Sequence, residues 1–122
     1  MERSDAMTTK TKRAAPRAYS RHCREALEVL GQLIKIHRIE RKLSVEDLAV
    51  RVGVSRDLLH RIERGDPRCG IGLTFEAAII VGVPLFASDR PALAIQKELQ
   101  SDKLRLLPKA VHKPRATVKD DF

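Results

Sequence analysis

The sequence of 122 residues contains no tryptophan, one tyrosine and three phenylalanines, so large aromatic side chains contribute little to its core. Its apolar residues make up 43% of the chain and are mostly Leu, Ile, Val and Ala. Aliphatic side chains of this kind suit short helices that pack closely, and a chain of this length has room for one core with tails. The composition therefore predicts an all-α fold with one compact domain.

Cysteine and histidine are too few and too widely spaced for a common metal or redox site. Cys23 and Cys69 are 46 positions apart and form neither a CxxC pair nor a zinc ribbon, and the four histidines form no HxxxH or HExxH motif. We therefore expect no metal and no cofactor, and we expect both thiols to be reduced and structural.

The motifs of common enzymes are also missing. The sequence has no phosphate-binding glycine loop, no nucleophile elbow and no paired acidic site, and its glycines fall where turns are expected. No stretch approaches the roughly 20 apolar residues of a membrane span, and the amino-terminal segment does not resemble a signal peptide. The sequence thus predicts a cytoplasmic protein that is not an enzyme, has no small-molecule substrate and does not contact a membrane.

Positive charge is in excess, with a net charge of +8 at pH 7, which indicates an anionic partner such as nucleic acid. Residues 26–90 carry ten basic and nine acidic side chains, so the excess lies mainly at the two ends. Residues 1–19 and 108–122 lack hydrophobic periodicity, and we expect a flexible basic arm and a flexible tail there. These ends either follow DNA phosphates or only increase solubility.

Between the ends, apolar periodicity and capping residues predict five helices. The first extends from an N-cap at Ser20 to Lys42, where Leu27, Leu30, Leu33, Ile34 and Ile36 recur at helical spacing. The next two follow N-caps at Ser44 and Ser55 and end at Gly53 and Gly65, and the last two are expected at residues 73–83 and 89–107. We assign residues 20–88 to one domain and residues 89–107 to a separate amphipathic helix.

The connection between the second and third helices has the residues that a tight turn needs. Asp47 is placed to complete a capping box with Ser44, Ala49 lets two helices cross at close range, and Gly53 tolerates a positive φ. The residues expected to lock the two helices together are Leu48, Val54, Leu59 and Ile62.

These positions form the pattern Leu43-Ser44-x-x-Asp47-Leu48-Ala49-x-x-Val52-Gly53-Val54-Ser55-x-x-x-Leu59-x-x-Ile62-Glu63-x-Gly65. The pattern resembles the Cro/C1-type helix-turn-helix, and with its flanking helices the resemblance covers residues 30–86. It implies a Cro/C1-type fold that binds double-stranded DNA with its third helix. It also implies an ion pair between Arg38 and Glu63, which we interpret as structural.

In this fold the start of the third helix enters the major groove. The side chains placed to touch base edges are Ser55, Arg56, Asp57, Leu58 and Arg61. Arg56 or Arg61 suits guanine, Asp57 suits the amine of cytosine, and an exposed Leu58 suits a thymine methyl group. The alternative is that Arg56 and Asp57 only form a solvated helix start.

Phosphate contacts are expected at the amino ends of the second and fourth helices. The residues assigned to them are Ser44, Ile71 and Gly72, with Arg41, Lys42 and Arg68 nearby. One position departs from the family, because Val45 stands where the family usually has a Gln that bonds phosphate and braces the third helix. Val45 has no polar group for this contact.

A second resemblance, to HipB-type antitoxins, is carried by the carboxyl-terminal half of the chain. The motifs are Ile62-Glu63-Arg64-Gly65-Asp66-Pro67, Phe75-Glu76-Ala77-Ala78, Val81-Gly82-Val83-Pro84-Leu85-Phe86 and a basic tail that closes in Asp120-Asp121-Phe122. This resemblance implies an antitoxin that binds and neutralises a HipA-type Ser/Thr kinase toxin and represses its own operon. The alternative is a solitary phage-like repressor without a toxin partner.

Two segments are candidates for contacts with other proteins. Residues 91–107 place Ala92, Ile95, Leu99 and Leu106 on one face, which forms a dimer, docks the toxin or packs within the chain. A homodimer would match an inverted-repeat operator, because a two-fold pair of reading heads spaced by one DNA turn fits such a site. Asp120, Asp121 and Phe122 form either a peptide hook for a partner or a frayed end.

Overall fold

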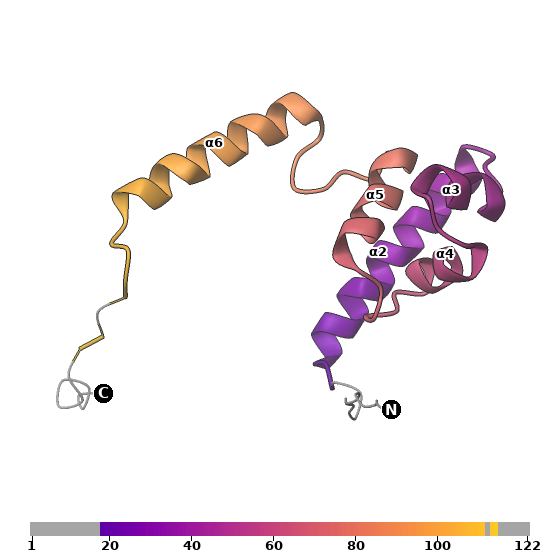
Figure 1. Cartoon of the computed structure of the whole chain (residues 1–122), viewed down its shortest axis with the longest axis horizontal. Helices are drawn as coiled ribbons and strands as arrows, with labels where there is room; N and C mark the ends of the chain where they lie inside the picture. The colour runs from indigo at the N-terminus through magenta and orange to yellow at the C-terminus, as the bar shows by residue number, and fades with distance from the viewer. Residues whose placement is uncertain (1–17, 112, 115–122) are drawn as a thin grey trace, which may run out of the picture. The chain divides into compact units, whose positions relative to one another are not determined.

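The computed structural model describes residues 18–111, 113 and 114, and in these residues it contains five helices and no strand (Figure 1). The helices are α2 (Arg21–Glu40), α3 (Val45–Val52), α4 (Arg56–Glu63), α5 (Ile71–Val81) and α6 (Arg90–Leu106). The all-α prediction is therefore confirmed. The expected arm at 1–19 lies almost wholly outside the described residues, as does the end of the expected tail at 108–122.

The chain divides into two compact units, Met1–Val83 and Pro84–Phe122. The first unit contains α2, α3, α4 and α5, and the second contains α6. Within the first unit, α3 and α4 pack against each other, α4 and α5 each pack against α2, and α3 also packs against α5. Thus α4 and α5 pack directly on the long helix α2, and α3 packs on α4 and α5.

Three serines begin three of these helices, as the sequence predicted. The hydroxyl oxygens of Ser20, Ser44 and Ser55 each accept a hydrogen bond from the backbone N–H three residues later. At Ser44 the capping box is complete, because its own N–H donates to Asp47 Oδ2 at 2.9 Å. This hydrogen bond also holds the pKa of the Asp47 carboxyl below its ordinary value.

Two helix boundaries differ from the sequence prediction. The first helix, α2, ends at Glu40 rather than Lys42, because Lys42 adopts a left-handed φ of 59° in the turn. The helix expected at residues 73–83 is α5, which begins two residues earlier at Ile71 and ends at Val81. Gly82 closes it with φ 87°, a conformation that glycine adopts without steric cost.

The core of the first unit consists of aliphatic side chains from all four of its helices. The buried apolar residues are Ile34, Leu48, Ala49, Leu59, Ile62, Ala77, Ala78, Val81 and Val83. Leu33 and Ile36, which recur at helical spacing with Ile34, are 38% and 49% exposed. The helix α2 therefore has apolar residues on two faces, and only the face of Ile34 turns toward the other helices.

The helix α6 buries none of its residues within its own unit. Asp89 caps its amino end by accepting the N–H of Ala92, and Pro91 lies in its first turn, as the sequence indicated. Ile95, Leu99 and Leu106 are all exposed. Most of the stability of a helix in a protein comes from the packing of its apolar face, so a partner for this face would stabilise α6.

A buried ion pair joins α2 to α4. Arg38 Nε lies 2.7 Å from Glu63 Oε2, and a second hydrogen bond runs from Arg38 Nη2 to Glu63 Oε1 at 3.2 Å. Arg38 also donates to the carbonyl oxygen of Leu43 at 2.9 Å, in the turn before α3. One guanidinium group therefore fixes three segments of the domain.

Replacing Glu63 with Gln should destabilise the domain by roughly 3–5 kcal/mol, because the buried Arg38 charge loses its counterion. The measurement is thermal and urea unfolding followed by circular dichroism. Glu76→Gln is the matched control, since Glu76 is exposed on α5 and should leave the transition unchanged. Equal melting temperatures for Glu63→Gln and the unmodified protein would contradict this account of the pair.

Candidate nucleic-acid interface

The helices α3 and α4 are joined by a tight turn. Gly53 adopts φ 87°, and the N–H groups of Gly53 and Val54 both donate to the carbonyl oxygen of Ala49, at 2.8 and 3.0 Å. Ser55 then begins α4 directly. Because Ala49 and Leu59 are buried, α3 and α4 meet closely and α4 turns its opposite face outward.

Arg56 and Asp57 occupy the first two positions of α4, and both are exposed. Neither makes a hydrogen bond or ion pair with another part of the chain that the structure describes. The Ser55 hydroxyl, by contrast, is engaged in capping, since it accepts the N–H of Leu58 at 3.0 Å. Arg56 and Asp57 are therefore the side chains most available to a ligand at the start of this helix.

The other two side chains assigned to base reading are less accessible. Leu58 is half-buried rather than exposed, so only part of its side chain is open to contact. Arg61 is also half-buried, and its Nε is a buried nitrogen without a hydrogen-bond partner among the described residues. The stem of Arg61 is thus covered by the domain, which limits the positions that its guanidinium group reaches.

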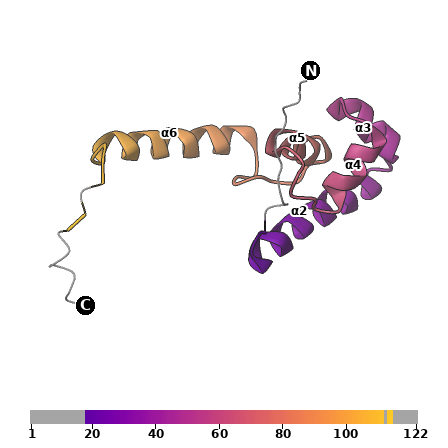
Figure 2. The ribbon, with the colours of Figure 1, turned by 60° about the horizontal axis from the view of Figure 1, so that its bottom comes forward.

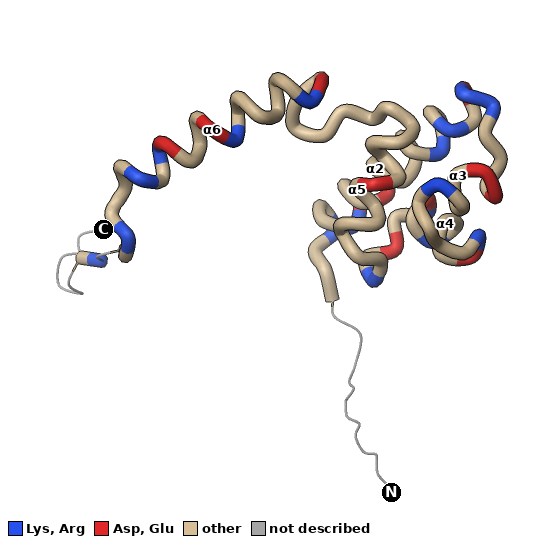
Figure 3. The backbone as a smooth tube through the Cα atoms, turned by 45° about the horizontal axis from the view of Figure 1, so that its top comes forward, with Lys and Arg blue, Asp and Glu red and all other residues tan. Residues whose placement is uncertain are grey.

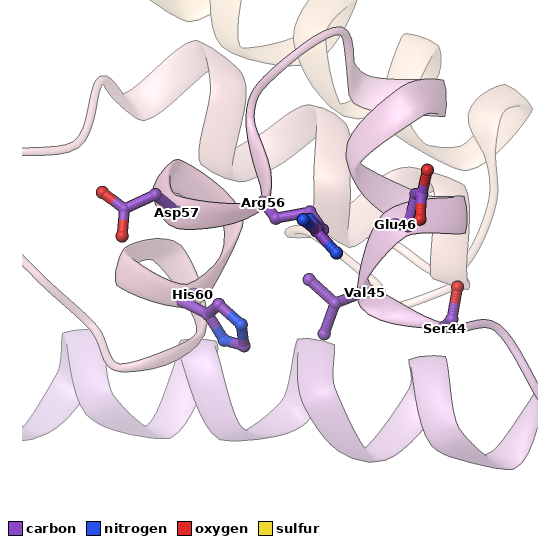
Figure 4. A pocket seen from close by; sticks show the side chains of 6 residues that line it. All are labelled: Ser44, Val45, Glu46, Arg56, Asp57 and His60. Atoms are coloured by element: carbon purple, nitrogen blue, oxygen red, sulfur yellow. The ribbon is translucent and has the colours of Figure 1, made fainter.

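A cleft of about 540 Å³ lies between the amino ends of α3 and α4 (Figure 4). Its lining residues are Ser44, Val45 and Glu46 from α3 and its cap, and Arg56, Asp57 and His60 from α4. In Figure 4, Arg56 and His60 extend toward Val45, whereas Asp57 points away from α3. Hydrogen-bond donors and acceptors therefore lie around one concave surface, an arrangement that suits the edges of nucleic-acid bases.

His60 and Glu46 were not among the site residues that the sequence predicted. His60 lies one helical turn beyond Arg56, so the two side chains share a face of α4. This could be predicted from the sequence, because the two residues are four positions apart. Glu46 is in the first turn of α3, opposite that face. Val45 is half-buried in the same cleft and gives it an apolar wall.

Five of the six residues assigned to phosphate contacts fall into two places. Arg41, Lys42 and Ser44 are exposed in the turn between α2 and α3. Ile71 and Gly72 are exposed in the first turn of α5, whose N-cap Gly70 makes no side-chain capping bond. The first N–H groups of α5 therefore have no side-chain acceptor and are available to an anion.

Arg68 is paired with its neighbour Asp66 in the loop between α4 and α5. Its Nε and Nη2 donate to the two carboxylate oxygens of Asp66 at 3.1 and 2.9 Å, and its backbone N–H donates as well. These hydrogen bonds lower the pKa of Asp66 to about 2. A phosphate contact by Arg68 would therefore compete with a carboxylate that stays ionised throughout the physiological range.

Charges of both signs are interspersed over α3, α4 and the turns beside them (Figure 3). Neither Cys23 nor Cys69 lines the cleft between α3 and α4. Both cysteines are free and half-buried, and burial raises the pKa of the Cys69 thiol. Among the described residues, no cluster of three His, Cys, Asp or Glu side chains is arranged to hold a metal ion.

None of the helices in the described part of the chain is both long and apolar enough to cross a membrane.

In comparisons with known proteins, residues 29–79 match a family model described as a helix-turn-helix domain. The matched segment begins within α2 and ends within α5, so it contains the whole of α3 and α4. No curated protein and no solved structure matches the chain. The match and the geometry agree that residues 29–79 contain a helix-turn-helix, with α3 and α4 as its two helices.

Proposed function

We propose that this protein is a transcriptional repressor that binds a specific double-stranded DNA sequence as a homodimer. The observation that carries the proposal is the exposed start of α4, where Arg56 and Asp57 have no partner among the described residues and border the cleft. Polar side chains held on a rigid helix without internal partners are suited to recognise an external ligand.

In the proposed complex, the start of α4 enters the major groove. Arg56 donates two hydrogen bonds to O6 and N7 of a guanine, and Asp57 accepts one from the amine of a cytosine. Arg61 reaches a base or phosphate with the outer end of its guanidinium group only, because its Nε is buried. Leu58, which is half-buried, contributes a smaller apolar contact than a fully exposed side chain would.

The phosphate contacts hold this helix in register. The turn with Arg41, Lys42 and Ser44 and the amino end of α5 with Ile71 and Gly72 supply charge and free N–H groups on the same unit as α4. The helix α4 has only eight residues, so a single copy reads few base pairs. Two copies related by a two-fold axis would read both halves of an inverted repeat.

The test is a titration of the purified protein against its own promoter DNA and a scrambled duplex at about 150 mM salt. We expect a preference of about a thousandfold for the promoter, which Arg56→Ala removes without unfolding the protein. Lys35→Ala is the matched control, because it removes one exposed positive charge from α2, away from the cleft. Equal and strongly salt-dependent binding to both duplexes would contradict the proposal and assign binding to charge alone.

We further propose that the repressor is the antitoxin of a toxin–antitoxin pair and neutralises a HipA-type Ser/Thr kinase. This proposal is supported by the resemblance of the carboxyl-terminal motifs to HipB-type antitoxins and by the exposed apolar residues of α6, which include Ile95, Leu99 and Leu106. The proposed hook of Asp120, Asp121 and Phe122 lies outside the described residues, so it rests on the sequence alone. A solitary repressor would need no partner for α6.

Co-purification with a HipA-type kinase encoded beside the gene tests the antitoxin proposal. Leu99→Glu places a charge on the apolar face of α6 and should abolish retention of the kinase while promoter binding persists. Gln100→Glu introduces the same charge at the next position and should retain the kinase. Absence of a neighbouring kinase gene, or normal retention by Leu99→Glu, would favour the solitary repressor.

A further inference from the structure

The helix α2 has a second apolar face that no other helix of its unit covers. Val29, Leu33 and Ile36 are 53%, 38% and 49% exposed, although all three lie in the middle of a 20-residue helix. They lie on the side opposite Ile34 and Arg38, which are buried against the rest of the domain. A helix that is apolar on both faces is usually buried on both, so this face predicts a partner.

The spacing along this face is that of a helix that pairs with another helix. His22, Ala26, Val29, Leu33, Ile36 and Glu40 follow one another at alternating intervals of four and three residues, and we call these six residues the outer stripe. Such alternation keeps one narrow line of side chains along a helix that packs lengthwise against a partner. The stripe is about 27 Å long at 1.5 Å per residue, which is most of the length of α2.

The outer stripe faces away from the helices that carry the nucleic-acid interface. Figure 2 shows α3, α4 and α5 gathered along one side of α2, which forms the edge of this unit. A partner helix on the outer stripe would therefore leave the cleft and the start of α4 uncovered. This is what a DNA-binding dimer requires of its dimer contact.

We propose that the partner is a second copy of the chain, and that two α2 helices pair in antiparallel orientation along their outer stripes. The proposal rests on the homodimer proposed above and adds the place where it forms. In this register Val29 lies opposite Leu33 of the partner subunit and Ala26 lies opposite Ile36 of the partner subunit. Each small side chain is matched with a larger one, which favours close packing.

The polar ends of the stripe favour the antiparallel orientation over the parallel one. His22 lies opposite Glu40 of the partner subunit, so a ring N–H donor meets a carboxylate at both ends of the pair. In a parallel pair, Glu40 would face its own copy, and two carboxylates side by side repel each other. Both His22 and Glu40 are exposed and make no hydrogen bond or ion pair within the described residues, so each is available to the partner.

Sedimentation equilibrium of the full chain without DNA tests the location of the contact. We expect a reversible dimer whose association constant falls about a hundredfold or more in Ile36→Glu, because the new charge is buried in the contact. Ile39→Glu is the matched control, since Ile39 is 55% exposed on the same helix but lies outside the outer stripe. Circular dichroism melting should show that both variants remain folded.

A charge exchange tests the orientation. His22→Glu should weaken association several-fold, because it brings a second carboxylate to Glu40 of the partner subunit, and the double variant His22→Glu/Glu40→Lys should restore it. In a parallel pair each new side chain would face its own copy, so the double variant would remain weak. That result would overturn the antiparallel assignment.

The remaining outcomes separate this inference from the homodimer proposal. A chain that stays monomeric at all concentrations and on its operator contradicts both. A dimer that survives Ile36→Glu but dissociates in Leu99→Glu contradicts only the outer stripe and moves the contact to α6. A variant Ile36→Glu that melts at a lower temperature without any change in mass would show that the stripe is covered within one chain.

Discussion

The orientation of α4 depends on its contact with α2, and two features fix that contact. Gly31 lies so close to α4 that a Cβ atom there would overlap the backbone carbonyl oxygens of Glu63 and Ile62. Beside this point, the carboxylate of Glu63 is held by two nitrogens of Arg38. The first feature sets the distance between the helices, and the second sets their relative rotation, because a bidentate ion pair tolerates little change in angle.

The interface follows from this crossing. With Glu63, Leu59 and Ile62 turned toward α2 and α3, Arg56 and His60 remain exposed on the side of α4 that borders the cleft. Because Arg38 also binds the carbonyl oxygen of Leu43, the same guanidinium holds the turn that leads into α3. The two walls of the cleft are therefore positioned by one buried group, and loss of that group would disturb both walls together.

Local signals in the sequence were sufficient for most of the fold. Ser44 and Asp47 define a helix start through bonds between neighbouring residues, so the capping box and the left-handed Gly53 were predicted correctly. The start of α5 was missed because Gly70 and Gly72 indicate a loop, whereas the structure places Gly72 inside the helix. The faces of α2 were harder still, since apolar residues at both Ile34 and Ile36 satisfy helical spacing and only tertiary packing decides which is buried.

The candidate site was predictable in position but not in detail. The exposure of Arg56 and Asp57 follows from their place at the start of α4, and the structure agrees with it. The partial burial of Leu58 and Arg61 depends on packing against neighbouring segments, and the spacing of residues within α4 does not predict that packing. His60 was not predicted, although its spacing of four residues from Arg56 places the two side chains on the same face of α4.

The proposed DNA-binding surface is formed by the amino ends of α3 and α4. The most direct test is the backbone amide NMR spectrum of isotope-labelled protein, recorded with and without a duplex selected from a random pool. We predict that the largest shifts fall on the amides of residues 44–46 and 55–61, while the amides of Val29 and Ile36 are unchanged on binding. Shifts confined to residues 1–17 and 108–122, with α4 unaffected, would contradict the account.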